Sequence, residues 1–196
     1  MNRVFLIIFS FLIGFTVFSD EEVKTIDLKR IRETWLSWVN EERQKLGLHS
    51  YQYDMRLEKT ALTWSNISKE RGYITHKRDM EDNLLYNYKA ITIWFEEQGL
   101  KFKNIKGYTF TENIGYGYFK YKTGDYTDEI IKAIHSTFEY YMNEKGKTDK
   151  WESAHYRSII APFFYFLGLG IALDENNDCY YLTVHYGSEI EDIRKQ

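Results

Sequence analysis

The feature that most constrains the fold is a change of hydrophobic period near Ala154. Before it, apolar residues recur every three or four positions, the period of an amphipathic helix. After it, Leu167, Leu169 and Ile171 alternate with other residues, and residues 180–186 alternate again. Residues 175–178 (ENND) separate these runs and predict the turn of a β-hairpin. Helices followed by strands in a chain of 196 residues predict an α+β layered domain.

Four helical runs are predicted before this change of period. They cover residues 26–46, 54–72, 83–98 and the run that starts at Thr127. Asp54 and Thr127 are good N-cap residues for the second and fourth helices, because a short polar side chain there accepts a backbone N–H bond. Gly47 and Gly72 suit the ends of the first two, since glycine readily adopts the left-handed conformation that ends a helix.

The composition excludes several classes of protein. With 18% aromatic residues and a single proline, the chain is not of the disordered type. The formal net charge of −3 gives no support for a nucleic-acid partner. Cys179 is the only cysteine, so no intrachain disulfide can form and stability has to come from packing.

The N-terminal segment has the pattern of a signal peptide. Arg3 supplies a positive start, about 15 apolar residues follow, and Val17 and Ser19 occupy the small-residue positions of a cleavage site. The run is short for a membrane span, which takes about 20 residues. We therefore expect an exported protein that is secreted, periplasmic or at the cell surface. An uncleaved signal-anchor is the alternative, and the protein would associate with a membrane only if that segment were retained.

These observations predict four parts of the chain. They are a signal peptide at residues 1–19, a lead-in at 20–30, a single domain at 31–187 and a charged tail at 188–196. Neither a proline-rich or glycine/serine-rich linker nor an internal repeat interrupts residues 25–187.

Several short segments share their order and spacing with a known family. They are residues 54–57 (DMRL), 73–76 (YITH), 111–115 (TENIG), 154–157 (AHYR), 167–170 (LGLG) and 180–186 (YYLTVHY). In this order the chain resembles the CAP superfamily of cysteine-rich secretory proteins, antigen 5 and pathogenesis-related proteins of class 1. It is similar to the bacterial branch, which lacks the disulfides. The resemblance implies a three-layer α-β-α sandwich with a central antiparallel sheet.

The resemblance also implies a cleft where two histidines and two acids meet. His76 and His155 match the two histidines, and Glu112 matches the first acid, with Asn113 and the nearby glycines shaping the turn that aims it. The family has its second acid on the fourth helix, three residues after a tryptophan. In this sequence that position falls on Tyr140 or Tyr141, while Glu139 and Glu144 lie out of register. A tyrosine hydroxyl is therefore expected in place of the second acid.

Two roles are open for this cleft. In one, His76 and His155 hold a divalent metal such as Zn²⁺, and Glu112 acts as the base of a metal-assisted, protease-like hydrolase. In the other, Glu112 accepts a hydrogen bond from an imidazole and braces the fold. His185 alternates with Val184 and is expected on a sheet face rather than as a ligand.

The missing second acid favours a binding module over an enzyme. The expected function is that of an exported CAP-domain protein whose cleft or surface binds a lipid or a protein partner. A metal-assisted hydrolase and a structural envelope protein are the alternatives.

Overall fold

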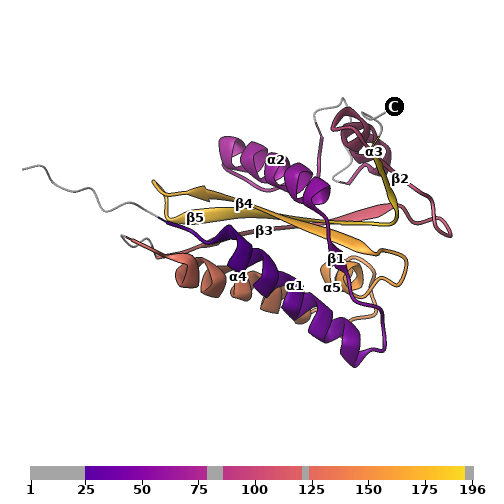
Figure 1. Ribbon diagram of the computed structural model, residues 1–196, viewed down its shortest axis with the longest axis horizontal. Coiled ribbons are helices and arrows are strands. Elements are labelled where there is room, and N and C mark those ends of the chain that lie inside the picture. The colour runs from indigo at the N-terminus through magenta and orange to yellow at the C-terminus, as the bar shows by residue number, and fades with distance from the viewer. Residues whose placement is uncertain (1–24, 79–85, 121–123, 193–196) are drawn as a thin grey trace, which may run out of the picture.

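The computed structural model describes residues 25–78, 86–120 and 124–192. Figure 1 shows three layers, in which helices cover both faces of a central sheet. The helices α2 (Met55–Arg71) and α3 (Tyr88–Glu97) lie on one side. On the other side lie α1 (Leu28–Lys45), α4 (Thr127–Met142) and the short α5 (Ala154–Ile159). The predicted α+β three-layer sandwich is confirmed.

The central sheet has the strand order β1-β4-β5-β3. Its three long strands are β3 (Phe110–Tyr118), β4 (Phe166–Asp174) and β5 (Cys179–Gly187), and they pair antiparallel. The two-residue β1 (Gln52–Tyr53) pairs with β4 in parallel, which adds one short parallel edge to the expected antiparallel sheet. A separate two-stranded sheet joins β2 (Leu100–Phe102) to β6 (Ile190–Asp192). The predicted hairpin is confirmed as β4 and β5.

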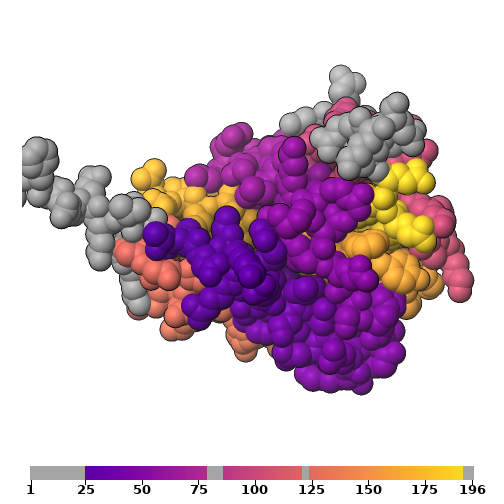
Figure 2. All heavy atoms as spheres, viewed as in Figure 1, coloured from indigo at the N-terminus to yellow at the C-terminus, as the bar shows by residue number. Residues whose placement is uncertain are grey.

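The first two helices begin and end close to the predicted residues. The Asp54 carboxylate accepts the backbone N–H of Arg56 at 2.8 Å, as expected of an N-cap. Gly72 ends α2 with φ of +75°, in the left-handed conformation that glycine adopts without strain. Figure 2 shows the side chains of α1 and α2 covering much of one face of the molecule.

The third and fourth helices differ from the prediction at their starts. Helix α3 begins at Tyr88 after the N-cap Asn87, and predicted positions 83–85 lie outside the described residues. Thr127 is not the N-cap of α4 but its first residue, and Tyr126 precedes it without a side-chain cap. The Thr127 hydroxyl instead accepts the Asp27 backbone N–H at 2.8 Å, which ties α4 to the start of α1.

The main hydrophobic core lies between the sheet and the α1–α4 layer. It includes Trp35, Ile130, Ile134 and Val184, each with none of its surface exposed. On the opposite face α2 packs directly on β4, because Gly168 has no side chain. A Cβ at that position would lie 2.1 Å from the Glu58 backbone nitrogen.

The structure does not describe the predicted signal peptide, since residues 1–24 lie outside the described part, as do residues 193–196 of the predicted tail. Within residues 25–78, 86–120 and 124–192, no helix has the length and apolar character needed to cross a membrane.

Candidate functional site

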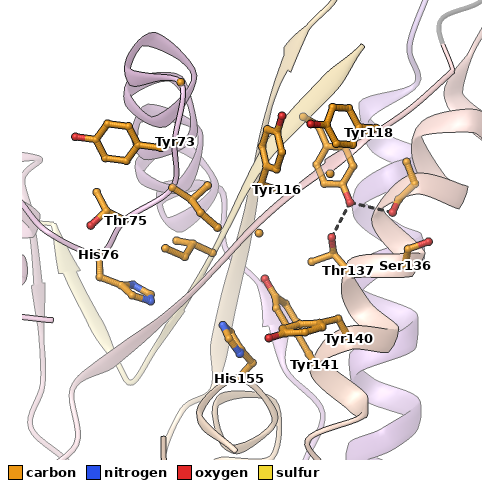
Figure 3. A pocket seen from close by; sticks show the side chains of 17 residues that line it. Tyr73, Thr75, His76, Tyr116, Tyr118, Ser136, Thr137, Tyr140, Tyr141 and His155 are labelled. Atoms are coloured by element: carbon orange, nitrogen blue, oxygen red, sulfur yellow. Dashed lines mark hydrogen bonds between the residues drawn. The ribbon is translucent and has the colours of Figure 1, made fainter. Parts of the chain in front are cut away.

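A cleft of about 910 Å³ opens between the end of α2, strand β3 and helix α4. His76 lies at its α2 side, and His155, the second residue of α5, lies opposite (Figure 3). Tyr140 and Tyr141 of α4 also line it. In Figure 3 both imidazoles and both of these hydroxyls point toward the same space. Four of the segments that carry the family resemblance, at 73–76, 111–115, 154–157 and 180–186, therefore contribute residues to one cleft.

Glu112 lies beside this cleft but does not line it. Its side chain is fully buried and accepts hydrogen bonds from three residues. His76 Nδ1 lies 2.8 Å from Oε1, and His185 Nε2 lies 2.7 Å from Oε2. The Arg78 guanidinium reaches both oxygens, at 3.2 Å and 2.6 Å. Both carboxylate oxygens thus have partners inside the protein.

The surrounding charges keep Glu112 ionised. Burial alone would raise the pKa of this carboxyl, but the charge of Arg78 and the hydrogen bonds from His185 and His76 outweigh burial and hold the pKa well below its usual range. Burial also lowers the pKa of His185, although the hydrogen bond to Glu112 and the charge of that carboxylate act to raise it. Glu112 is therefore a weak base near neutral pH, because a carboxylate of low pKa takes up a proton poorly.

Arg78 is itself enclosed by aromatic rings. Its guanidinium carbon lies 3.4 Å from the centre of the Trp64 ring and 4.5 Å from that of Trp94. Two indole faces and one carboxylate replace the water that this cation loses on burial. Arg78 holds Glu112, and Glu112 in turn holds His76.

The second histidine has an acid partner of its own, which is Glu144. Oε1 of Glu144 lies 2.6 Å from His155 Nδ1, and Oε2 accepts the backbone N–H groups of His155 and Tyr156 at 2.8 and 3.0 Å. His155 therefore has an acid partner, although the position expected for the second acid holds Tyr140 or Tyr141, which both line the cleft. Glu144 lies just beyond the end of α4, after a turn of backbone, so counting along the helix placed it out of register.

The other predicted residues are also accounted for. Asn113 does not line the cleft, and its amide donates instead to the His155 backbone carbonyl at 3.1 Å. Tyr141 is buried and stacks on the His155 ring, with centroids 4.5 Å apart. Tyr140 is exposed at the rim. His185 lies on the sheet, as expected, but its contact with Glu112 makes it part of the support behind the cleft.

Sequence reasoning did not find Arg78 or the role of His185. The register of the sheet could have indicated His185, because Glu112 on β3 pairs directly with His185 on β5. Arg78 follows His76 by two residues, and no spacing rule predicts that its side chain turns back onto Glu112.

A family model described as CAP, the cysteine-rich secretory protein family, matches residues 36–186. The chain belongs to the CAP family. The same fold occurs in an outer surface protein from Borrelia burgdorferi, at 17% identity and a TM-score of 0.55, covering 84% of this chain and 96% of that one. No curated protein matches the sequence.

Two further bacterial structures share the CAP fold. The CAP domain of enterococcal PrgA has 19% identity and a TM-score of 0.53, covering 82% of this chain and 61% of that one. An extracellular protein containing an SCP domain from Bacillus anthracis has 14% identity and a TM-score of 0.51, covering 82% and 41%. At these identities the likeness concerns the fold alone.

The histidines of the CAP cleft are the potential ligands for a metal ion. An ionised carboxylate only accepts hydrogen bonds, so each carboxylate here accepts one from the Nδ1–H of its imidazole, which leaves Nε2 as a potential ligand. Catalytic zinc sites take three protein ligands. No group of three or more His, Cys, Asp or Glu in the described part of the chain could hold a metal. The site therefore offers two imidazoles and does not fit a three-ligand catalytic zinc centre.

Proposed function

We propose that this CAP domain is an exported binding module whose cleft takes a small ligand, either on its own or as a group of a larger partner. The observation that carries this proposal is the cleft of about 910 Å³ with two imidazoles held toward it. A pocket of this size suits a small molecule, and a few fixed polar groups among aromatic walls are typical of ligand sites.

The two braced imidazoles support binding because they are preorganised. Glu112 fixes His76 and Glu144 fixes His155, in each case through Nδ1. Each ring therefore presents Nε2 to the cleft before any ligand arrives. Groups that are already oriented lose less entropy on binding, which raises affinity.

A hydrolase has less support than a binding module. Glu112 is the acid expected to act as a base, yet Arg78, His76 and His185 occupy both of its oxygens. Glu144 is likewise engaged by three N–H groups. Both carboxylates have the contacts of supports for histidine rather than of proton acceptors for a reacting group.

A divalent cation such as Zn²⁺ between His76 and His155 is the second candidate. The Nε2 atoms, which have no hydrogen-bond partner among the described residues, favour it. A cation there would supply a positive charge with open coordination positions in a cleft whose described lining holds no Asp, Glu, Lys or Arg. Calorimetry should then find about one Zn²⁺ per chain. Alanine at His76 or His155 should abolish binding, and equal affinity in the variants would exclude the site.

Export is supported by the N-terminal pattern of Arg3, the apolar run and the Val17/Ser19 pair. It also agrees with the secretory character named in the family description. Mass spectrometry of the native protein should find Asp20 at the N-terminus. An intact Met1 in a membrane fraction would support the signal-anchor instead.

Ligand binding is tested by filling the cleft. Ser136 lines it from an exposed position on α4, so Ser136→Trp should occupy the cleft without disturbing the core. Lys132→Trp is the matched control, because Lys132 is exposed on the same helix and does not line the cleft. A fragment library screened by ligand-observed NMR should give hits that Ser136→Trp abolishes and Lys132→Trp keeps. An absence of hits, or hits that survive Ser136→Trp, would contradict the proposal.

A further inference from the structure

The described lining of the cleft carries no acidic side chain and no basic one besides its two histidines. The acids behind the two histidines are engaged inside the protein, Glu112 by Arg78 and Glu144 by N–H groups. A charged ligand would leave water without gaining an opposite charge, which is costly. The cleft therefore suits a neutral ligand.

The walls carry many hydroxyl groups, of which those of Thr137 and Tyr180 are already hydrogen-bonded within the protein. More than half of the lining residues are Tyr, Ser or Thr, whereas the aliphatic ones are Ile74, Ile114 and Ala133. Tyrosine rings thus make up more of the wall than aliphatic side chains do. Three tyrosines at the rim, Tyr73, Tyr118 and Tyr140, are more than half exposed. Each offers a flat apolar ring and a polar end.

The Tyr141 hydroxyl independently indicates a ligand, because it lacks a hydrogen-bond partner among the described residues. The Tyr141 side chain is 1% exposed. The ring lines the cleft and is fixed by stacking on His155. Burial raises the pKa of Tyr141 well above its ordinary value, so the hydroxyl keeps its proton and is a donor. A buried donor without a partner is unfavourable, and a ligand acceptor would relieve it.

The polar groups of the cleft form a complementary set. Tyr141 offers an O–H donor, and the Nε2 atoms of His76 and His155 are acceptors when the rings are neutral. A matching ligand carries several groups that both donate and accept, has no charge, and presents apolar C–H faces to the tyrosine rings. Sugar rings have these properties together.

We infer that the cleft binds a neutral saccharide and that the Tyr141 hydroxyl donates a hydrogen bond to it. This inference rests on the proposed function of the cleft as a ligand site. It names the class of ligand, and it identifies Tyr141 as a binding residue rather than as a substitute for an acid.

The test uses the full chain on an array of neutral glycans that covers the common neutral hexose and N-acetylhexosamine linkages, followed by calorimetry with the best binder. Binding is expected for the wild type and should be lost in Ser136→Trp. Tyr141→Phe should weaken it by about five- to tenfold, the effect of one hydrogen bond. The unfolding temperature of Tyr141→Phe should stay equal or rise, because the hydroxyl that it removes has no partner in the described part of the protein. Tyr108→Phe, outside the cleft, should change neither quantity.

The possible outcomes separate this inference from the proposed function. If no neutral glycan binds, but a long-chain fatty alcohol binds and is excluded by Ser136→Trp, the cleft is a ligand site and the saccharide inference is wrong. Equal glycan affinity in the wild type and Tyr141→Phe would overturn the role of Tyr141. If neither probe binds, both the inference and the proposed function fail.

Discussion

Two carboxylates in this molecule do the same task in different surroundings. Glu112 and Glu144 each accept a hydrogen bond from Nδ1 of one cleft histidine, with N···O distances of 2.8 and 2.6 Å. Glu112 lies in the sheet, where a buried arginine and a second histidine also hold it. Glu144 lies in the loop after α4, where it also accepts two backbone N–H groups at the start of α5.

An imidazole can be oriented by a carboxylate that needs a buried cation beside it, or by one that does not. In the sheet, the negative charge of Glu112 needs a positive charge beside it, because that side chain is fully buried. In the loop, backbone N–H groups and one imidazole satisfy Glu144, with no formal cation among its described partners. Removing Glu112 should therefore damage the whole domain, whereas removing Glu144 should have a local effect.

The largest effect is expected from Glu112→Ala. It leaves Arg78 buried as an unpaired cation and His185 without its Nε2 partner. The free energy of unfolding should fall by about 3–5 kcal/mol, the range for breaking a buried ion pair from one side. Denaturant unfolding followed by circular dichroism measures this loss. Glu112→Gln should be nearly as costly, since an amide does not balance the charge.

A double variant tests whether the unpaired charge of Arg78 causes this loss of stability. The double variant Glu112→Leu/Arg78→Met removes both charges and replaces them with apolar side chains of similar volume. It should therefore be more stable than Glu112→Ala. If Glu112→Ala unfolds within about 0.5 kcal/mol of the wild type, Glu112 is not the support that its contacts imply.

A smaller effect is expected from Glu144→Ala. It removes three accepted hydrogen bonds but leaves no buried cation among its described partners. The loss in the free energy of unfolding should be about 1–3 kcal/mol. Glu144→Gln keeps an acceptor oxygen and should cost less than Glu144→Ala. A loss as large as that of Glu112→Ala would remove the difference between the two sites.

The loss of stability in mild acid should come from the buried His185 imidazole. The pKa of His185 is lowered in the folded state, so the unfolded chain binds a proton first as the pH falls below about 6.5. His185 thus contributes stability above that pH and loses it below. The slope from this group is at most about 1.4 kcal/mol per pH unit. Urea midpoints between pH 7.5 and 5 should fall, and His185→Gln should flatten the fall. An unchanged slope in that variant would exclude His185 as its source.

The α+β class and the hairpin could be predicted from the sequence because the periodic signals are local, while the three-layer arrangement was implied by the family resemblance. The alternation of Leu167, Leu169 and Ile171 and the caps at Asp54 and Gly72 depend on neighbours within a few residues. The family pattern likewise located His76 and His155, which both line the cleft.

The supports of the site were harder to predict because they depend on side-chain direction. Glu144 reaches His155 only after the chain leaves α4, so a helical count cannot place it. Gly115 is a second case, because its role depends on a contact between layers that no local sequence pattern predicts. A Cβ there would lie 2.6 Å from Thr137 Cγ2 and 3.0 Å from the Tyr141 hydroxyl, so this glycine lets α4 pack against β3. That requirement appears only once the layers are assembled.

The smallest expected effect concerns the ring protons rather than stability. If Glu112 and Glu144 both accept from Nδ1, neutral His76 and His155 should carry their proton on Nδ1 and show an unprotonated Nε2. Nitrogen-detected NMR of the imidazoles at pH 8 distinguishes the two tautomers. Glu144→Ala should return His155 toward the mixture of tautomers found in free imidazoles and leave His76 unchanged, because the two pairs share no residue. Asn113→Ala is a suitable control, since Asn113 contacts His155 through the backbone carbonyl and not the ring. Protonated Nε2 on either ring in the wild type would contradict the orientation of that imidazole. It would also remove one of the two acceptors on which ligand recognition in the cleft depends.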